Sequence, residues 1–198
     1  MGVVVKADGY GTGMVAAARA ALRGGASTLL VATLDEAFGL RAAGLTARIL
    51  VLYPVPPVVL PAAVAARLDL VVADDGSVEA MAALLSSSGA ADARSGNPGP
   101  RVHLGIDSGM GRGGIAPEHA AAAAHRLLGA GLGALAGTWS HLATPEDPVS
   151  VAGQVERFEA ALTVLAEAGI DPGIRHLDAT VGLLGGACPT YDMVRVGL

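Results

Sequence analysis

Short apolar segments alternate with longer, alanine-rich segments along the whole chain, and this alternation limits the possible folds. The apolar segments predict eight strands, at residues 3–5, 28–32, 48–52, 70–73, 102–106, 135–139, 174–177 and 193–196. The segments between them predict helices at residues 14–23, 34–43, 60–67, 77–85, 117–128 and 151–168. This order is typical of parallel βαβ units in an α/β protein. Eight strands favour a (β/α)8 TIM-type barrel, with a doubly wound open sheet as the alternative.

Length and composition indicate one ordered domain. Over 198 residues, 52% are apolar and 16% charged, so we expect a single domain spanning residues 1–198. A net charge of -5, scattered arginines and 3% aromatic residues exclude a nucleic-acid partner. The uncharged segment 49–66 contains four prolines, so we expect no membrane span. The lone Cys188 and a start that leads directly into a strand predict a cytoplasmic protein. We interpret residues 86–100 as a surface loop.

Lysine occurs once in the chain, at position 6. Lysine and arginine together number 13, which leaves twelve arginines. Arginine cannot replace lysine where the nitrogen must lose its proton and attack a carbonyl carbon. Genome composition can also favour arginine, so the count alone does not separate a functional lysine from an accidental one. Lys6 follows the first predicted strand and precedes three glycines, and this position favours a lysine that forms a Schiff base.

Residues capable of chemistry gather just after the predicted strands. A (β/α)8 barrel carries its active site on the loops that follow the carboxyl ends of its strands, so residues far apart in sequence meet at one mouth. We expect no metal site there. The residues concerned are Lys6, Tyr10, Asp107, Arg112, His141, Asp178, Thr180, Arg195, Gly197 and Leu198.

Three of these residues have a specific chemical interpretation. Arg112 lies in the glycine-rich segment 105–114, where its planar cation suits a carboxylate or phenolate oxygen, although such a loop is also common as a plain surface turn. The ring of His141 can stack on a flat cofactor or transfer protons, and a hydrogen-bonded core histidine is the simpler alternative. Arg195 lies between apolar neighbours in a strand, so its charge requires a buried partner or a ligand.

Five segments, in order along nearly the whole chain, carry a family resemblance. They are Lys-Ala-Asp-Gly-Tyr-Gly-Thr-Gly at 6–13, Val-His-Leu-Gly-Ile-Asp-Ser-Gly-Met-Gly-Arg at 102–112, Ser-His-Leu-Ala at 140–143, Gln154 with Phe158, and Asp-Met-Val-Arg-Val-Gly at 192–197. In this combination the chain resembles the barrel domain of alanine racemases.

The resemblance implies a pyridoxal 5'-phosphate enzyme that interconverts L- and D-alanine and so supplies D-alanine for peptidoglycan. Lys6 matches the catalytic lysine that binds the cofactor covalently and moves the α proton on one face. Arg112 matches the arginine near the cofactor's phenolic oxygen and the substrate carboxylate, and His141 matches the histidine packed on the ring. Arg195 matches the residue that faces the pyridine nitrogen. The implied phosphate contacts are Tyr10, Thr180, Gly197 and Leu198.

The chain departs from the family pattern at three positions and in length. Gly105 stands where many members carry a lysine that braces the arginine matching Arg112, so either Asp107 takes over this role or Arg112 is held less firmly. Ala179 replaces an asparagine and Thr12 a histidine. The final helix, a preceding helical segment and a β-rich C-terminal domain are missing. We therefore expect a partial chain, truncated at both ends, of a protein that is a homodimer at full length.

The missing domain would supply the base on the opposite face, across the dimer interface. With Lys6 alone, we expect the α proton to exchange on one face more readily than the substrate inverts. Two alternatives remain: a barrel that binds pyridoxal phosphate for homeostasis without turnover, and a racemase of serine or another small amino acid. The loop 109–112, suited to a substrate carboxylate, favours an enzyme over the homeostasis barrel.

Overall fold

The computed structural model describes residues 1–87, 99–186 and 188–197, so most of the predicted loop at 86–100 lies outside the described residues. Eight parallel strands form one sheet in the order β7-β6-β5-β4-β3-β2-β1-β8. An isolated β-bridge joins Ala179 to Arg195 across the gap between the two edge strands, β7 and β8, so the sheet nearly closes into a barrel. The predicted (β/α)8 barrel is confirmed, and the doubly wound alternative is wrong. The strands are β1 Gly2–Val4, β2 Thr28–Val31, β3 Arg48–Val51, β4 Asp69–Val72, β5 Arg101–Gly105, β6 Gly137–Trp139, β7 Ile174–His176 and β8 Arg195–Val196.

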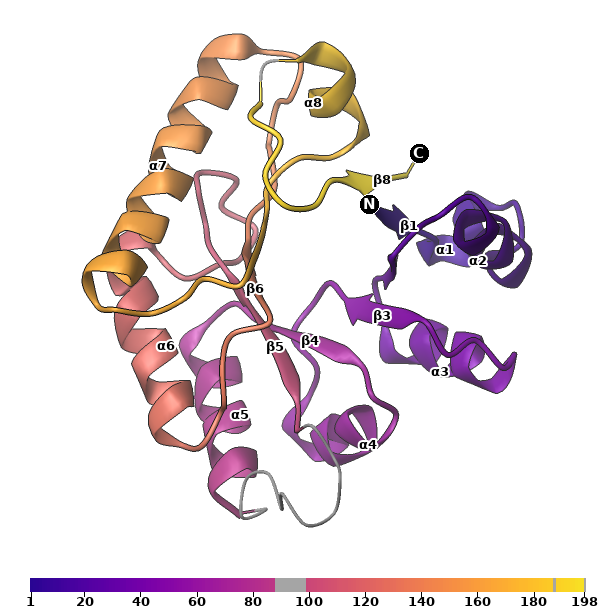
Figure 1. Cartoon of the computed structure of the whole chain (residues 1–198), viewed down its shortest axis with the longest axis horizontal. Helices are drawn as coiled ribbons and strands as arrows, with labels where there is room; N and C mark the ends of the chain where they lie inside the picture. Colours follow the sequence, from indigo (N-terminus) through magenta and orange to yellow (C-terminus); the bar gives the residue numbers. More distant parts are fainter. Residues whose placement is uncertain (88–98, 187, 198) are drawn as a thin grey trace.

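Helices surround the strands on the outside (Figure 1). They are α1 Lys6–Tyr10, α2 Met14–Arg23, α3 Leu34–Ala42, α4 Leu60–Ala65, α5 Asp75–Ser87, α6 Ala120–Gly129, α7 Pro148–Glu167 and α8 Thr180–Gly185. Short 3-10 turns, η1 Pro57–Val59 and η2 Pro117–His119, precede α4 and α6. The six predicted helices are present; α2 has the predicted ends and the other five have shifted ends. The sequence did not predict α8, because its segment TVGLLG is short and contains two glycines, which are poor helix formers.

Side-chain caps fix where two of the helices begin. At the start of α3, the Thr33 hydroxyl accepts a hydrogen bond from Glu36 N at 3.4 Å, and the Glu36 carboxylate accepts one from Thr33 N at 3.2 Å. At the start of α7, Asp147 accepts from Val149 N at 3.1 Å. Such caps satisfy backbone donors that the first helical turn leaves free. They therefore set the length of the loops that connect strand ends to helices.

The barrel has an apolar core outside its strands and a mixed core inside. The larger apolar cluster lies between strands and helices, and a smaller one, Leu30 with Leu50 and Val71, is separate from it. Four buried polar residues, Asp69, His103, His176 and Arg195, are linked to one another by hydrogen bonds. Buried polar groups are costly unless they are paired, so these residues need mutual partners. None of the described helices is long and apolar enough to cross a membrane.

Candidate active site

A cavity of about 400 Å³ opens at the carboxyl ends of the strands. Seven of the eight predicted cofactor and catalytic residues line this cavity: Lys6, Tyr10, Arg112, His141, Thr180, Arg195 and Gly197. Leu198 lies outside the described residues. Asp178 does not line the cavity, contrary to expectation, because it is buried and its Oδ1 accepts a hydrogen bond from Ala179 N at 2.7 Å. The loops after five different strands thus meet in one place.

Lys6 begins a left-handed turn. The segment α1 is helical in its hydrogen bonds, but Ala7, Asp8 and Tyr10 have φ angles of 51°, 53° and 55°. A left-handed conformation costs a residue other than glycine roughly 1–2 kcal/mol. Strain of this kind is common at functional sites, where the surrounding structure holds it in place. The turn therefore distinguishes the segment after β1 from an ordinary loop.

The Lys6 side chain is half-buried and directed to the cavity. Its Nζ lies 6.0 Å from the centre of the Tyr10 ring. In the part of the chain that the structure describes, Nζ has no hydrogen-bond or ion-pair partner. An amine without a carboxylate neighbour remains available to a carbonyl ligand.

Thr180 and Gly197 hold each other across the seam between β7 and β8. The Thr180 hydroxyl accepts a hydrogen bond from Gly197 N at 2.8 Å and donates one to Gly197 O at 2.6 Å. A Cβ at position 197 would lie 2.9 Å from Val4 Cβ and 3.2 Å from the Tyr10 hydroxyl, so glycine is required for this close approach. A ligand oxygen that binds Gly197 N has to replace the Thr180 hydroxyl.

His141 is a neutral ring beside Arg195. Its Nδ1 lies 3.1 Å from Arg195 Nη2, and because a guanidinium can only donate, Nδ1 carries no proton. Burial lowers the pKa of His141 to about 4, and the charges of Arg195 and Arg112 add to this effect. The ring is therefore uncharged at neutral pH. It is suited to pack against a flat ligand rather than to supply a proton.

Arg195 is buried, with 3% of its surface exposed, and its two terminal nitrogens are surrounded by acceptors. Nη1 donates to His176 O at 2.9 Å and contacts His176 Nδ1 at 3.0 Å. Nη2 donates to Ser140 O at 2.7 Å and Leu177 O at 2.8 Å. Burial lowers the pKa of Arg195 to about 10, so the side chain remains a cation at neutral pH. The buried partner that the sequence required is a set of carbonyls and imidazoles, and the described residues include no carboxylate in contact with it.

A chain of hydrogen bonds continues from Arg195 to Asp69. His176 Nε2 lies 3.1 Å from His103 Nδ1, and His103 Nε2 lies 3.4 Å from Asp69 Oδ2. Arg101 pairs with the same carboxylate at 3.1 Å. Burial alone would raise the pKa of Asp69, but His103 and Arg101 hold it below its usual value. We call Asp69, His103, His176 and Arg195 the polar axis.

The two ends of the polar axis determine the protons between them. Arg195 can only donate and the ionised Asp69 can only accept. Burial lowers the pKa of His103 and His176, so both rings are neutral and each has one N–H. Each hydrogen bond of the axis then contains one proton if His176 and His103 are both protonated on Nε2. We assign these tautomers from the hydrogen-bond pattern.

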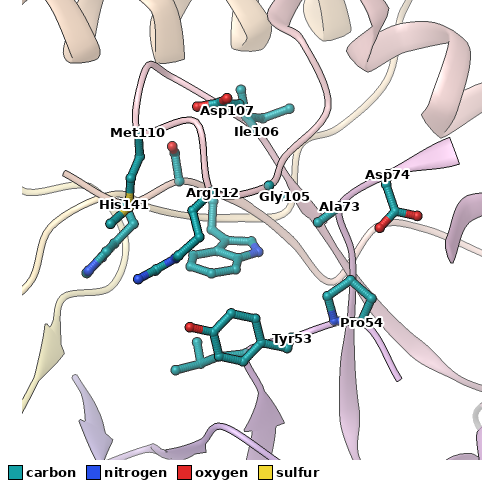
Figure 2. Close-up of a pocket in the computed structure, with 14 residues that line it drawn as sticks. Tyr53, Pro54, Ala73, Asp74, Gly105, Ile106, Asp107, Met110, Arg112 and His141 are labelled. Carbon is teal, nitrogen blue, oxygen red and sulfur yellow. The ribbon is translucent and has the colours of Figure 1, made fainter. Parts of the chain in front are cut away.

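Asp107 shapes the loop that carries Arg112 and does not brace its side chain. Asp107 Oδ1 accepts hydrogen bonds from Gly109 N at 2.9 Å and Gly111 N at 3.0 Å. Figure 2 shows its carboxylate away from the guanidinium of Arg112. The neighbour of that guanidinium is Tyr53, whose ring centre lies 5.7 Å from Arg112 Cζ, within the range of a cation–π contact.

Trp139 lies against Gly105, where the family pattern leads us to expect a lysine. A Cβ at Gly105 would lie 3.1 Å from Ala73 Cβ and 3.3 Å from Trp139 Nε1. The indole also stacks on His176, with ring centres 5.8 Å apart, and Arg195 Cζ lies 5.0 Å from its ring centre. Among the described residues, its buried Nε1 has no hydrogen-bond partner. The indole thus occupies the space directly beside Gly105.

Gln154 on α7 joins the loops after β5 and β6. Its Oε1 accepts a hydrogen bond from Ala143 N at 2.7 Å, and its Nε2 donates to His141 O at 3.1 Å and Ser108 Oγ at 3.3 Å. Gln154 is buried, so these bonds are protected from water. It therefore fixes the position of His141 relative to the loop that leads to Arg112.

Sequence reasoning missed the residues that support the site. Asp69 could have been found, because it is a charged residue beside the apolar run 70–73 and meets the criterion that selected Arg195. Trp139 and Tyr53 had no signal of this kind, since an aromatic residue at a strand end is usually part of the core.

Comparisons with known proteins agree on one family. The family model described as "Alanine racemase, N-terminal domain" matches residues 1–198. Two curated relatives named alanine racemase come from Thermobifida fusca, 42% identical over 201 residues, and Frankia casuarinae, 40% identical over 200 residues. Each match covers 98% of this chain but 51% and 50% of the relative, respectively. The chain thus spans about half the length of the curated relatives it matches.

Solved structures give the same result. The alanine racemase from Streptomyces coelicolor A3(2) is 35% identical with a TM-score of 0.85, and the match covers 99% of this chain and 52% of that one. The alanine racemase from Bacillus anthracis with bound L-Ala-P is 33% identical with a TM-score of 0.84, and the match covers 99% and 49%.

Proposed function

Because this chain belongs to the alanine racemase family, we propose that it binds pyridoxal 5'-phosphate and takes part in the interconversion of L- and D-alanine. One observation carries the proposal: the only lysine of the sequence lines the same cavity as Arg112, His141 and Arg195. These groups offer an amine, a carboxylate binder, a flat neutral ring and a buried cation.

The residues present fit this cofactor. The cavity volume of about 400 Å³ is within the range of small-molecule sites. Gly197 allows β8 to pass close to Tyr10, where a Cβ would intrude. When bound, pyridoxal 5'-phosphate supplies an electron sink that acidifies the α proton of an amino acid. The site residues then have to hold the ring, bind the substrate carboxylate and move one proton.

The resemblance implies the role of each residue, and the chemistry of the residue suits it. Lys6 would hold the cofactor covalently through its amine, and once the amine of the substrate has displaced it, the free Nζ would accept the α proton from one face of the substrate and return it. Arg112 binds the substrate carboxylate with its planar fork. The neutral ring of His141 packs against the cofactor ring. Arg195 can donate but not accept a proton, so it favours an unprotonated pyridine nitrogen.

The finer details of the proposal rest on the family resemblance. They are phosphate contacts from Tyr10, Thr180, Gly197 and Leu198, a homodimer at full length, a second base from the partner's C-terminal domain, and a cytoplasmic location. Lys6 supplies the one amine among the described residues that line the cavity, and the second base is expected from the partner, so we expect α-proton exchange to be faster than inversion.

The test uses the wild-type chain and two variants. The wild-type chain mixed with pyridoxal 5'-phosphate should acquire the absorbance of a lysine-bound cofactor, and borohydride reduction followed by peptide mass spectrometry should locate the cofactor at residue 6. Lys6→Ala should lose both signals. The double variant Lys6→Ala/Arg19→Lys carries its lysine on the exposed face of α2 and should not restore them. A wild-type chain that binds no cofactor at residue 6 contradicts the proposal.

Isotope exchange separates an enzyme from a binding protein. In deuterated water, the loaded chain should exchange the α proton of L-alanine, and D-alanine should form more slowly. Cofactor binding without exchange of L-alanine would instead favour the homeostasis barrel. Faster exchange of L-serine than of L-alanine would favour a different racemase.

A further inference from the structure

Glu36 connects the first turn of α3 to the peptide that follows Lys6. Its Oε2 accepts hydrogen bonds from Ala32 N at 2.7 Å and Thr33 N at 3.2 Å. Its Oε1 accepts one from Ala7 N, also at 2.7 Å. The carboxylate therefore has two separate tasks, one for each oxygen. One oxygen caps its own helix and the other holds the left-handed turn.

The bond to Ala7 restrains Lys6 directly. Ala7 N belongs to the peptide group between Lys6 and Ala7, so fixing its direction fixes the ψ angle of Lys6. The other bonds of the turn are local, such as Gly9 N to Val5 O at 2.9 Å and Gly13 N to Asp8 O at 2.8 Å. Local bonds maintain the shape of the turn. The bond to Glu36 orients it relative to the neighbouring βα unit.

Charge makes this anchor strong. Hydrogen bonds to an ionised carboxylate are shorter and stronger than those between neutral groups, and 2.7 Å is short for an N–H donor. Glu36 is half-buried, which protects the bond from water. A turn that contains three residues other than glycine in a left-handed conformation needs such an external restraint to persist.

We propose that Glu36 is a positioning residue for Lys6: through Ala7 N, its carboxylate sets the direction in which the lysine amine enters the cavity. The proposal rests on the proposed function, in which Lys6 binds the cofactor. Glu36 lies in the neighbouring βα unit and does not line the cavity, so it acts only through the backbone.

The variant Glu36→Gln separates the two tasks. A glutamine at this position keeps the capping side chain, but only one of its two terminal atoms can accept a hydrogen bond. The amide cannot serve both Ala7 N and the helix end, and α3 should remain capped because the helix end offers two donors. Asp35→Asn is the matched control, since Asp35 is an exposed carboxylate in the same turn with no hydrogen bond to the described residues.

The experiment measures three quantities in the wild-type chain and both variants: hydrogen exchange at Ala7 N, binding of pyridoxal 5'-phosphate at residue 6 after borohydride reduction, and the melting temperature. In Glu36→Gln we expect exchange at Ala7 N to be about tenfold faster and the dissociation constant of the cofactor about tenfold higher, as expected for one charge-assisted bond. The melting temperature should change little. Asp35→Asn should match the wild-type chain in all three.

Two results overturn the inference while leaving the proposed function intact. In the first, Ala7 N exchanges faster in Glu36→Gln but the cofactor binds as in the wild type, so the contact is merely structural. In the second, Glu36→Gln and Asp35→Asn weaken binding equally, so the effect is one of net charge. Failure of the wild-type chain to load residue 6 contradicts the proposed function itself. If Glu36→Gln melts far below the wild type, Glu36→Asp, which keeps the charge but shortens the reach, replaces it with the same expectations.

Discussion

The turn after β1 and the polar axis each bring a cation to the same cavity, but they hold it differently. Lys6 sits on a left-handed turn, half-buried, with no polar partner for its amine among the described residues. Arg195 is buried to 3% exposure and bonded to the backbone carbonyls of Ser140, His176 and Leu177 and to two imidazoles. In the turn the backbone is restrained and the side chain is free. In the axis the side chain itself is restrained.

This difference matches the chemistry proposed for the two groups. An amine that forms and breaks a covalent bond and carries a proton must move over short distances, so only its starting point can be fixed. A cation that sets the charge of a ring nitrogen has to stay in place, and a full set of acceptors achieves this. Stability should therefore depend on Arg195 and barely on Lys6.

The largest expected effect is a loss of stability when Arg195 is replaced, and replacement of Lys6 should cause almost none. Arg195→Met leaves His176 Nδ1 and the carbonyls of Ser140 and Leu177 without their donor. Because each buried acceptor left unpaired costs about 1–3 kcal/mol, we expect the free energy of unfolding to fall by about 3–5 kcal/mol. Lys6→Met should change it by about 0.5 kcal/mol or less, since its amine has no such partner. Urea denaturation of both variants tests this contrast, and equal losses would contradict it.

Acid should lower the folding stability through His141, the neutral ring beside Arg195. Burial lowers the pKa of His141 to about 4, from 6.5 in the unfolded chain. Between these values the unfolded chain binds a proton that the folded chain does not, so stability falls as the pH decreases from 6.5 to 4, by about 3 kcal/mol. His103 and His176, whose pKa values are also lowered by burial, act in the same direction. Urea midpoints measured across this range should fall less steeply in His141→Asn than in the wild type.

A smaller effect should follow from changing the far end of the polar axis. Asp69→Asn removes the ionised acceptor that fixes the proton of His103, and we expect a loss of about 1–3 kcal/mol. Nitrogen-15 NMR of the imidazoles should show His103 and His176 protonated on Nε2 in the wild type and a mixture of tautomers in the variant. Asp192→Asn, which breaks a surface pair with Arg175, is the control and should leave these signals unchanged. A single unchanged tautomer in Asp69→Asn would show that Asp69 does not control the axis.

The smallest effect concerns the strained backbone of the turn. Ala7→Gly relieves a φ angle of 51°, and we expect stability to rise by about 0.5–1 kcal/mol after the greater entropy of the unfolded chain is subtracted. Ala16→Gly on the exposed face of α2 should instead lower stability by about 1 kcal/mol. Thermal melts of the two variants should move in opposite directions, and a loss in both would mean that the turn is not strained.

The sequence alone is sufficient to predict the barrel and the residues that lie at its mouth. Apolar periodicity reports burial, and the rule that loops after parallel strands converge then places Lys6, Arg112, His141 and Arg195 together. Periodicity carries no information on handedness, so it does not predict the left-handed turn at Ala7. It also could not show which side chains meet inside a closed sheet.

The supporting contacts depend on that closure. Asp69 and Arg195 are far apart in sequence, and their link through two histidines exists only because the sheet closes. The bracing of Arg112 illustrates the same limit, since Asp107 was the natural candidate from its sequence position. In the structure Asp107 is occupied by backbone amides of its own loop, and Tyr53 from the end of β3 stands beside the guanidinium instead.

Trp139 gives the molecule an intrinsic optical probe. It is the only tryptophan of the chain, and its ring lines the cavity and lies against both His176 and Arg195. Tryptophan fluorescence of the protein therefore comes only from this cavity-lining indole. A chromophore that enters the cavity and absorbs at the emission wavelength should quench it by energy transfer, so occupancy of the site can be followed in real time without a label.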